Sequence, residues 1–205
     1  MKLLYAPGAC SLGIHAILAQ IGKPFEIQAV NLKDGEQRSA SYVALNPKSK
    51  VPTLVRDDGS VVTEFPAIAY YLVRSNPEAG LFPEGLEEQT RALEATDYIV
   101  STIHMQGFSR IFRPSGFTTD PAQEEKVKAG GMEMVEKGLK LIDGQLGSKT
   151  FITGKLSFAD FALFYVTFWY GKRMGQQLPA NLARHWAAME ALPGVQKALK
   201  AEGLV

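Results

Sequence analysis

The sequence is short of the features that mark several classes of protein. Cys10 is its only cysteine, so the chain forms no internal disulfide and holds no second thiol. The formal net charge is +1, which leaves no basic excess for a nucleic-acid backbone. No apolar run approaches the roughly 18 residues of a membrane span, and residues 1–7 lack the apolar core of a signal peptide. We therefore expect a cytoplasmic protein that binds neither nucleic acid nor membrane, in which Cys10 reacts only with external thiols.

Length and composition predict two domains with ordinary cores. The chain has 205 residues, of which 46% are apolar and 21% charged. Composition shifts toward proline, glycine and glutamate at residues 77–85, which indicates a linker. We therefore expect one domain at residues 1–80 and another at residues 86–205.

The first domain is predicted to combine a mixed β-sheet with helices on both faces. Apolar spacing predicts strand, helix, strand, helix, strand, strand and helix at residues 2–5, 14–21, 25–32, 40–45, 51–55, 61–63 and 65–76. The pair Asp58-Gly59 is typical of a tight hairpin between the last two strands.

The second domain is predicted to be an all-helical bundle. Helical spacing covers residues 86–112, 121–146, 157–171, 180–191 and 193–201. Ser157 and Asp160 fit a capping box at the start of the third of these helices, although Asp is shorter than the usual Glu.

Cys10 is placed where a thiolate is stabilised. It lies between the Pro7-Gly8 loop and the first amphipathic helix, where backbone amides and the helix dipole favour negative charge. A small buried hydrophobic residue is an equally good interpretation of a lone cysteine. The position alone leaves both interpretations open.

Two further segments allow both a binding and a structural interpretation. Pro52 at the entry to a strand is compatible with a cis peptide beside a ligand or with an ordinary trans proline. At the turn from strand to helix, Glu64 is able to bind an ammonium and the amide of Phe65 a carboxylate. Helix capping by Thr63 or Glu64 is the simpler alternative.

Four ordered blocks resemble the signature segments of cytosolic glutathione transferases. They are residues 5–12 (YAPGACSL), 46–54 (NPKSKVPTL), 63–72 (TEFPAIAYYL) and 157–160 (SFAD). The cysteine in the first block is similar to that of the bacterial beta class. The resemblance implies a thioredoxin-like βαβαββα domain followed by a helical C-terminal domain.

The same resemblance implies roles for the residues of the first domain. The backbone of Val51, before a cis Pro52, would pair with the cysteinyl part of glutathione. Glu64 would bind the γ-glutamyl ammonium, and the Phe65 amide would bind the γ-glutamyl carboxylate. Lys33 would lie near the glycyl end. Cys10 would meet the sulfur as a catalytic residue.

Similar beta-class proteins also line the site from the second domain, here with Asp97, Ser101 and His104. Their spacing puts them on one helix face. Without the resemblance, His104 is better explained as a satisfied histidine; with it, we expect a catalytic contact to sulfur. Two departures are evident. Phe65 offers no hydroxyl, and Met105 and Gln106 replace the lysine that commonly follows the histidine.

Several aromatic residues are candidates for the wall of an acceptor pocket, although such residues more often form core. They are Phe108, Phe112, Phe164, Tyr165, Phe168 and Trp169.

The resemblance implies that the protein is a glutathione transferase. We expect it to conjugate the glutathione thiolate to small, largely apolar electrophiles, as in detoxification. Glutathione is then the co-substrate, no metal is needed, and the expected assembly is a homodimer. A glutathione-dependent reductase or lyase using a Cys10 mixed disulfide is the alternative enzyme. A non-catalytic binding protein with the same fold is an alternative of another class.

Overall fold

The computed structural model describes all residues, Met1–Val205, and the chain divides into two compact units. The first unit comprises Met1–Phe82 together with Ala187–Val205, and the second comprises Pro83–Trp186. The expected second domain, residues 86–205, includes the C-terminal segment, which by its contacts groups with the first unit instead.

The sheet of the first unit has the order β2-β1-β3-β4. Its strands are β1 (Lys2–Tyr5), β2 (Glu26–Ala29), β3 (Thr53–Val55) and β4 (Val61–Thr63). β1 pairs parallel to β2 and antiparallel to β3, and β3 pairs antiparallel to β4. The mixed sheet and the hairpin at Asp58-Gly59 confirm the sequence prediction.

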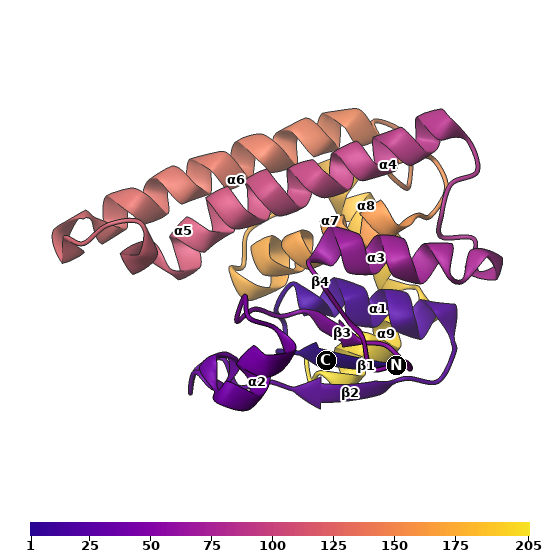
Figure 1. The fold of residues 1–205 in the computed structure, drawn as a ribbon. Coiled ribbons are helices and arrows are strands. Elements are labelled where there is room, and N and C mark those ends of the chain that lie inside the picture. The colour runs from indigo at the N-terminus through magenta and orange to yellow at the C-terminus, as the bar shows by residue number, and fades with distance from the viewer. The chain divides into compact units, whose positions relative to one another are not determined.

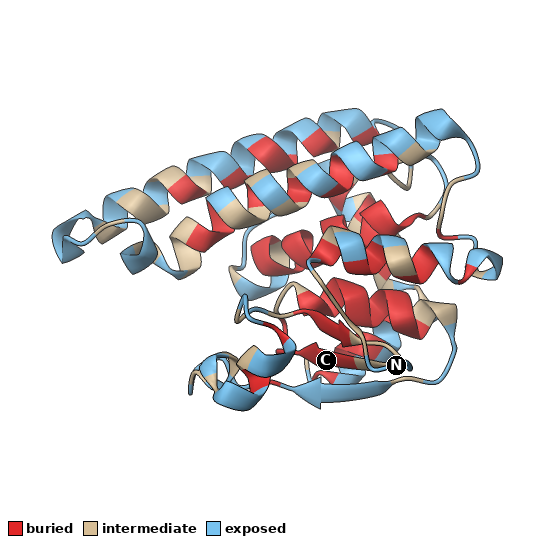
Figure 2. Ribbon diagram, in the orientation of Figure 1, coloured by how far each residue is buried: buried red, intermediate tan, exposed pale blue.

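Helices lie on both faces of this sheet (Figure 1). Successive strand residues point to opposite sides, so both faces carry side chains that a helix can cover. They are α1 (Ser11–Ile21), α2 (Ala40–Leu45) and α3 (Phe65–Arg74), with short turns η1 (Glu36–Arg38) and η2 (Pro77–Ala79). Leu4 packs with Val30 and with Tyr42 of α2. Residues Ser11–Ala19 of α1 are all buried (Figure 2).

The last helix, α9 (Pro193–Ala201), packs along α1 (Figure 1). The Gly194 amide donates to Oε1 of Gln20 at 3.0 Å. A Cβ on Gly194 would lie 2.5 Å from the backbone nitrogen of Gln20, so glycine is required for this close approach. The C-terminal segment is therefore an integral part of the first unit.

The second unit is helical, as predicted. Its principal helices are α4 (Leu86–Tyr98), α5 (Ser109–Phe112), α6 (Glu124–Leu146) and α7 (Phe158–Phe168). A π-helical segment, η3 (Ile99–Phe108), joins α4 to α5, and another, η6 (Trp169–Arg173), follows α7. The remaining elements are η4 (Pro114–Gly116), η5 (Pro121–Gln123) and α8 (Ala180–Glu190), which begins in the second unit and ends in the first. None of the helices is long and apolar enough to cross a membrane.

The capping box predicted at Ser157 is confirmed. The buried carboxylate of Asp160 accepts hydrogen bonds from the amides of Ser157 at 2.8 Å and Ile152 at 2.9 Å. His185 Nε2 lies 3.2 Å from the same carboxylate. Every residue of α7 is buried. The capping box fixes where this buried helix starts.

Candidate functional site

Strand register brings three predicted segments of the first unit to one edge of the sheet. Thr53 pairs with Leu4 of β1 and with Thr63 of β4. Pro52 comes directly before Thr53, and Glu64 comes directly after Thr63. Because both pairings are antiparallel, the end of β1, the start of β3 and the end of β4 coincide.

Cys10 lies in the loop that follows β1 and directly precedes α1. Its thiol is partly buried, and Sγ donates to the carbonyl oxygen of Val51 at 3.4 Å. The thiol therefore touches the backbone of the residue predicted to bind the cysteinyl part of a ligand. This placement disfavours the interpretation of Cys10 as a fully buried packing residue.

The loop before Cys10 is held by the first residue of α1. Ser11 Oγ donates to the carbonyl oxygen of Ala6 and accepts from the amide of Ala6, both at 3.2 Å. The Ala9 amide also donates to the Ala6 carbonyl at 3.0 Å. These bonds limit the freedom of the segment that carries the thiol.

The Val51–Pro52 peptide is cis, as the resemblance implies. The turn before it is held by Tyr42, whose hydroxyl donates to the Lys50 carbonyl at 2.6 Å. Asn46 Nδ2 donates to the same carbonyl, and to Thr53 Oγ1, both at 2.8 Å. Sequence reasoning missed Tyr42 and Asn46 as supports of the site, since nothing in their spacing connects them to Val51.

Tyr42 and its hydrogen-bond partners Asn46 and Thr53 are buried. Burial raises the pKa of Tyr42, and hydrogen bonds with Thr53 and Asn46 oppose that rise. The hydroxyl therefore stays protonated near neutral pH and continues to donate to the Lys50 carbonyl.

Glu64 does not cap its helix, which excludes one of the structural alternatives. Its side chain makes no capping hydrogen bond to α3. Instead, Glu64 Oε1 lies 2.9 Å from Lys48 Nζ, which also donates to Thr63 Oγ1 at 2.8 Å. Glu64 has φ = 70°, a conformation that side-chain-bearing residues rarely adopt. The carboxylate thus pairs with a cation at the edge of the sheet, on a strained backbone.

Phe65 and Lys33 differ in burial and in the element that carries them. Phe65 is buried and is the first residue of α3, so its amide lies at the positive end of the helix dipole. Lys33 is exposed in the turn before η1, where its amide donates to Asn31 Oδ1 at 3.1 Å. The role of Lys33 stays a prediction.

The second unit holds the other three predicted residues. Asp97 and Ser101 are exposed, whereas His104 is partly buried. His104 Nδ1 lies 3.2 Å from the hydroxyl of Tyr165. Ser101 and His104 lie in η3 rather than in a regular α-helix, and π-helical segments often occur at functional sites.

The candidate aromatic residues separate into two clusters. Trp169 contacts the rings of His104, Phe108, Phe112 and Tyr165, with centroids 4.8 to 5.5 Å apart. The other cluster stacks on Trp186 and consists of Phe164, at 5.2 Å, and Phe168, at 6.3 Å. Only the first cluster includes the histidine.

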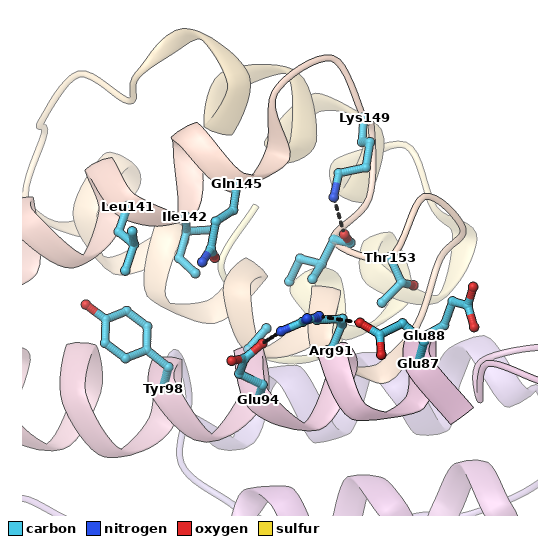
Figure 3. Close-up of a pocket in the computed structure, with 12 residues that line it drawn as sticks. Glu87, Glu88, Arg91, Glu94, Tyr98, Leu141, Ile142, Gln145, Lys149 and Thr153 are labelled. Atoms are coloured by element: carbon cyan, nitrogen blue, oxygen red, sulfur yellow. Dashed lines mark hydrogen bonds and ion pairs between the residues drawn. The ribbon is translucent and has the colours of Figure 1, made fainter. Parts of the chain in front are cut away.

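A separate pocket of about 510 Å³ lies in the second unit between α4, the end of α6 and the loop after it (Figure 3). It contains none of the predicted site residues. Arg91 in this pocket pairs with Glu87 at 2.9 Å and Glu94 at 2.8 Å, and Lys149 Nζ donates to the Ile152 carbonyl at 2.9 Å. Its cationic groups are thus already matched by partners within the chain.

Comparison with known proteins decides the family. The chain is 36% identical over 208 residues to the glutathione S-transferase GstA of Escherichia coli O157:H7, with 100% of each chain covered. The chain belongs to the glutathione S-transferase family. Residues 8–75 match the family's N-terminal domain and residues 99–193 match its C-terminal domain. The protein is accordingly a transferase enzyme.

Solved structures agree with this assignment. The transferase superposes on the bacterial beta-class glutathione S-transferase of Sphingomonas chungbukensis with a TM-score of 0.86 at 32% identity, covering 100% of both chains. A sphingomonad glutathione S-transferase complexed with glutathione gives a TM-score of 0.85 at 32% identity, again with 100% of both covered. The thioredoxin-like first domain and the helical second domain are those expected from the sequence.

The backbone strain from the positive φ of Glu64 can be tested by comparing two substitutions at this position. Glu64→Gly should be more stable than Glu64→Ala by about 1 to 2 kcal/mol, because only alanine retains the cost of the positive φ. Urea unfolding followed by circular dichroism gives the two free energies. At Glu26, an exposed residue of strand β2, the order should reverse, since glycine weakens a strand. Equal stabilities at position 64 would contradict the strain.

Proposed function

We propose that the transferase binds glutathione at the edge of the sheet in the first unit. The observation that carries this proposal is the contact of Cys10 Sγ with the Val51 carbonyl, directly before cis Pro52. A peptide ligand pairing with the Val51 backbone brings its own cysteinyl sulfur beside that thiol. Cys10 then serves as a polar contact to the sulfur.

Glu64 binds the γ-glutamyl ammonium in this proposal. Its present partner is Lys48, and both side chains are about half exposed, at 54% and 53%. Exposed ion pairs contribute little stability, so a ligand ammonium exchanges for Lys48 at small cost. The Phe65 amide binds the γ-glutamyl carboxylate, and Lys33 binds near the glycyl end.

Asp97, Ser101 and His104 also bind glutathione in this proposal, with His104 as the second catalytic residue. The contact of His104 with the Tyr165 hydroxyl and the ring of Trp169 supports a fixed orientation of its imidazole. A fixed imidazole is suited to hydrogen bonding with a developing thiolate.

The reaction is nucleophilic substitution or addition by glutathione. The thiol proton passes to solvent and sulfur forms a bond to an electrophilic carbon. In substitution a leaving group departs with its bonding electron pair, and in addition the acceptor's π bond breaks and the neighbouring carbon takes up a proton from water. Phe108, Tyr165 and Trp169 are buried, so Phe112, which is partly buried, is the candidate contact for small, largely apolar acceptors. Such conjugation in the cytoplasm is the chemistry of detoxification.

Calorimetry on a charge-removing variant tests the glutathione site. Glu64→Gln should weaken glutathione binding by about 1 to 3 kcal/mol, because the amide no longer carries a charge opposite the ammonium. Glu78→Gln is the matched control, since Glu78 forms a similarly exposed 2.9 Å pair with Lys23 in the same unit. It should bind glutathione as wild type does. Unchanged affinity in Glu64→Gln would overturn this assignment.

A glutathione-dependent reductase or lyase is the second candidate, favoured by the partial exposure of the Cys10 thiol beside the ligand backbone. Attack of its thiolate on oxidised glutathione forms a Cys10–glutathione disulfide and releases one glutathione thiolate. Intact-protein mass spectrometry should show one adduct that dithiothreitol removes and that Cys10→Ala lacks. Reaction only after denaturation would show that Cys10 is a packing residue and leave glutathione binding through Val51 and Glu64.

We also propose that the transferase is a homodimer, because closed two-fold dimers are the commonest assemblies of soluble proteins. Light scattering at micromolar concentration should give twice the chain mass of 22.4 kDa. A particle with the mass of a single chain would refute the dimer.

A further inference from the structure

An exposed guanidinium lies over the partly buried ring of Phe112. It belongs to Arg173, the last residue of η6, whose Cζ lies 4.4 Å from the centroid of that ring. On its own side, Phe112 stacks on Phe108 at 5.6 Å and contacts Trp169 edge-to-face at 5.5 Å. Phe108 and Trp169 are buried, so they hold the ring on which the cation rests. The guanidinium therefore lies directly beside the candidate contact for the acceptor.

The guanidinium of Arg173 has neither an ion pair nor a hydrogen bond within the chain. Burial raises the pKa of the neighbouring Tyr170, and the charge of Glu136 raises it further, but Glu136 forms no ion pair with Arg173. A guanidinium carries five N–H donors around its edge, and contact with a ring through its face uses none of them. The donors of Arg173 are thus available to a ligand.

The elements that carry this aromatic cluster are rich in positive charge. Residues 98–119 and 161–189 include neither Asp nor Glu, although the whole chain has a net charge of only +1. The lysine and arginine side chains of the two ranges are Arg110, Arg113, Lys172, Arg173 and Arg184. Positive charge without matching carboxylates favours the approach of an anionic ligand to these elements.

The other cations of this set have partners of their own. Those partners are Gln106 for Arg110, Ser109 for Arg113, Lys149 for Arg184 and the ring of Trp186 for Lys172. Arg173 differs from all of them, because it lacks a polar partner and contacts the cluster around Trp169.

Trp169 connects this cation with the proposed catalytic histidine. The indole contacts the ring of Phe112 at 5.5 Å and that of His104 at 4.8 Å. An acceptor that packs on Phe112 is therefore separated from His104 by a single aromatic side chain. All of these residues belong to the second unit of the chain.

We propose that Arg173 is a specificity-determining residue that selects acceptors carrying a carboxylate. The apolar ring of the acceptor packs against Phe112, and its carboxylate pairs with the guanidinium over the same ring. The planar fork of an arginine matches the two oxygens of a carboxylate. The preferred substrates are thus small aromatic electrophiles with one carboxylate. The inference rests on the proposed transferase function and names the substrate class of that site.

Two matched acceptors test this selection. They are a chlorodinitrobenzoate with chlorine para to the carboxylate and the corresponding benzamide, which share the ring and the leaving group but differ in charge. In both reactions the glutathione thiol loses its proton to solvent, and sulfur bonds to the carbon that carries chlorine. Chloride leaves with the bonding electron pair. Each variant is compared with wild type on the same acceptor, so the intrinsic reactivities of the two acceptors cancel.

Arg173→Gln should raise KM for the benzoate roughly 10- to 100-fold, because a charge-assisted pair is lost. Its kcat for the benzoate, and both constants for the benzamide, should stay within about twofold of wild type, as expected when only binding is affected. Arg173→Lys keeps the charge without the fork and should recover part of the loss. A benzoate KM within twofold of wild type in Arg173→Gln, or an equal loss with both acceptors, would overturn the proposal.

Arg110→Gln is the matched control, since Arg110 also lies over a ring, that of Phe117, at 4.4 Å. It should match wild type with both acceptors. An equal rise of the benzoate KM in Arg110→Gln would show a general effect of charge and overturn the proposal. Glutathione carries carboxylates as well. A rise of its own KM in Arg173→Gln with both acceptors would place Arg173 at glutathione and overturn the proposal too.

Calorimetry with the dinitrobenzoate and dinitrobenzamide that lack chlorine judges the selection apart from catalysis. Wild type should bind the benzoate about 10-fold more tightly than the benzamide, and Arg173→Gln should bind the two equally. Equal binding of both probes by wild type would overturn the proposal. If wild type shows this preference but no glutathione-dependent activity, the proposed function fails while the carboxylate site stands.

Discussion

The central position of β3, paired on one side with β1 and on the other with β4, is the constraint on which the candidate site depends. Each pairing is antiparallel, so the segments after β1, before β3 and after β4 end at one edge. Much of what they present there is backbone, including the Val51 carbonyl and the Phe65 amide. A site built from backbone groups depends on strand register more than on the side chains that the strands carry.

Local patterns were sufficient to predict most of the architecture. Helical spacing and the Asp58-Gly59 turn gave the βαβαββα order, and the capping box at Ser157 gave the start of α7. These features are encoded within a few residues of one another, which is why a single sequence reveals them. The proline at position 52 marked the site, but the cis peptide itself was implied only by the resemblance to a family.

Long-range contacts were beyond the reach of the sequence. No spacing rule connects Glu202 with Gly8, or shows that Gly194 allows α9 to approach α1 closely. The π-helical segment η3 was also missed, since its residues fit ordinary helical spacing. The aromatic residues after His104 were also recognised from the sequence as a group. Only the structure shows which of them contact Trp169 and which contact Trp186.

The Gly8 amide donates to the side chain of Glu202 at 2.8 Å, a contact between residues made early and late in synthesis. A ribosome produces the N-terminal segment first, and domains generally fold as they emerge. Here the cysteine loop and the start of α1 leave the ribosome almost 200 residues before Glu202 does. The first unit therefore cannot reach its final structure until residues 187–205 have emerged, and the loop around Cys10 gains its contact with Glu202 only then.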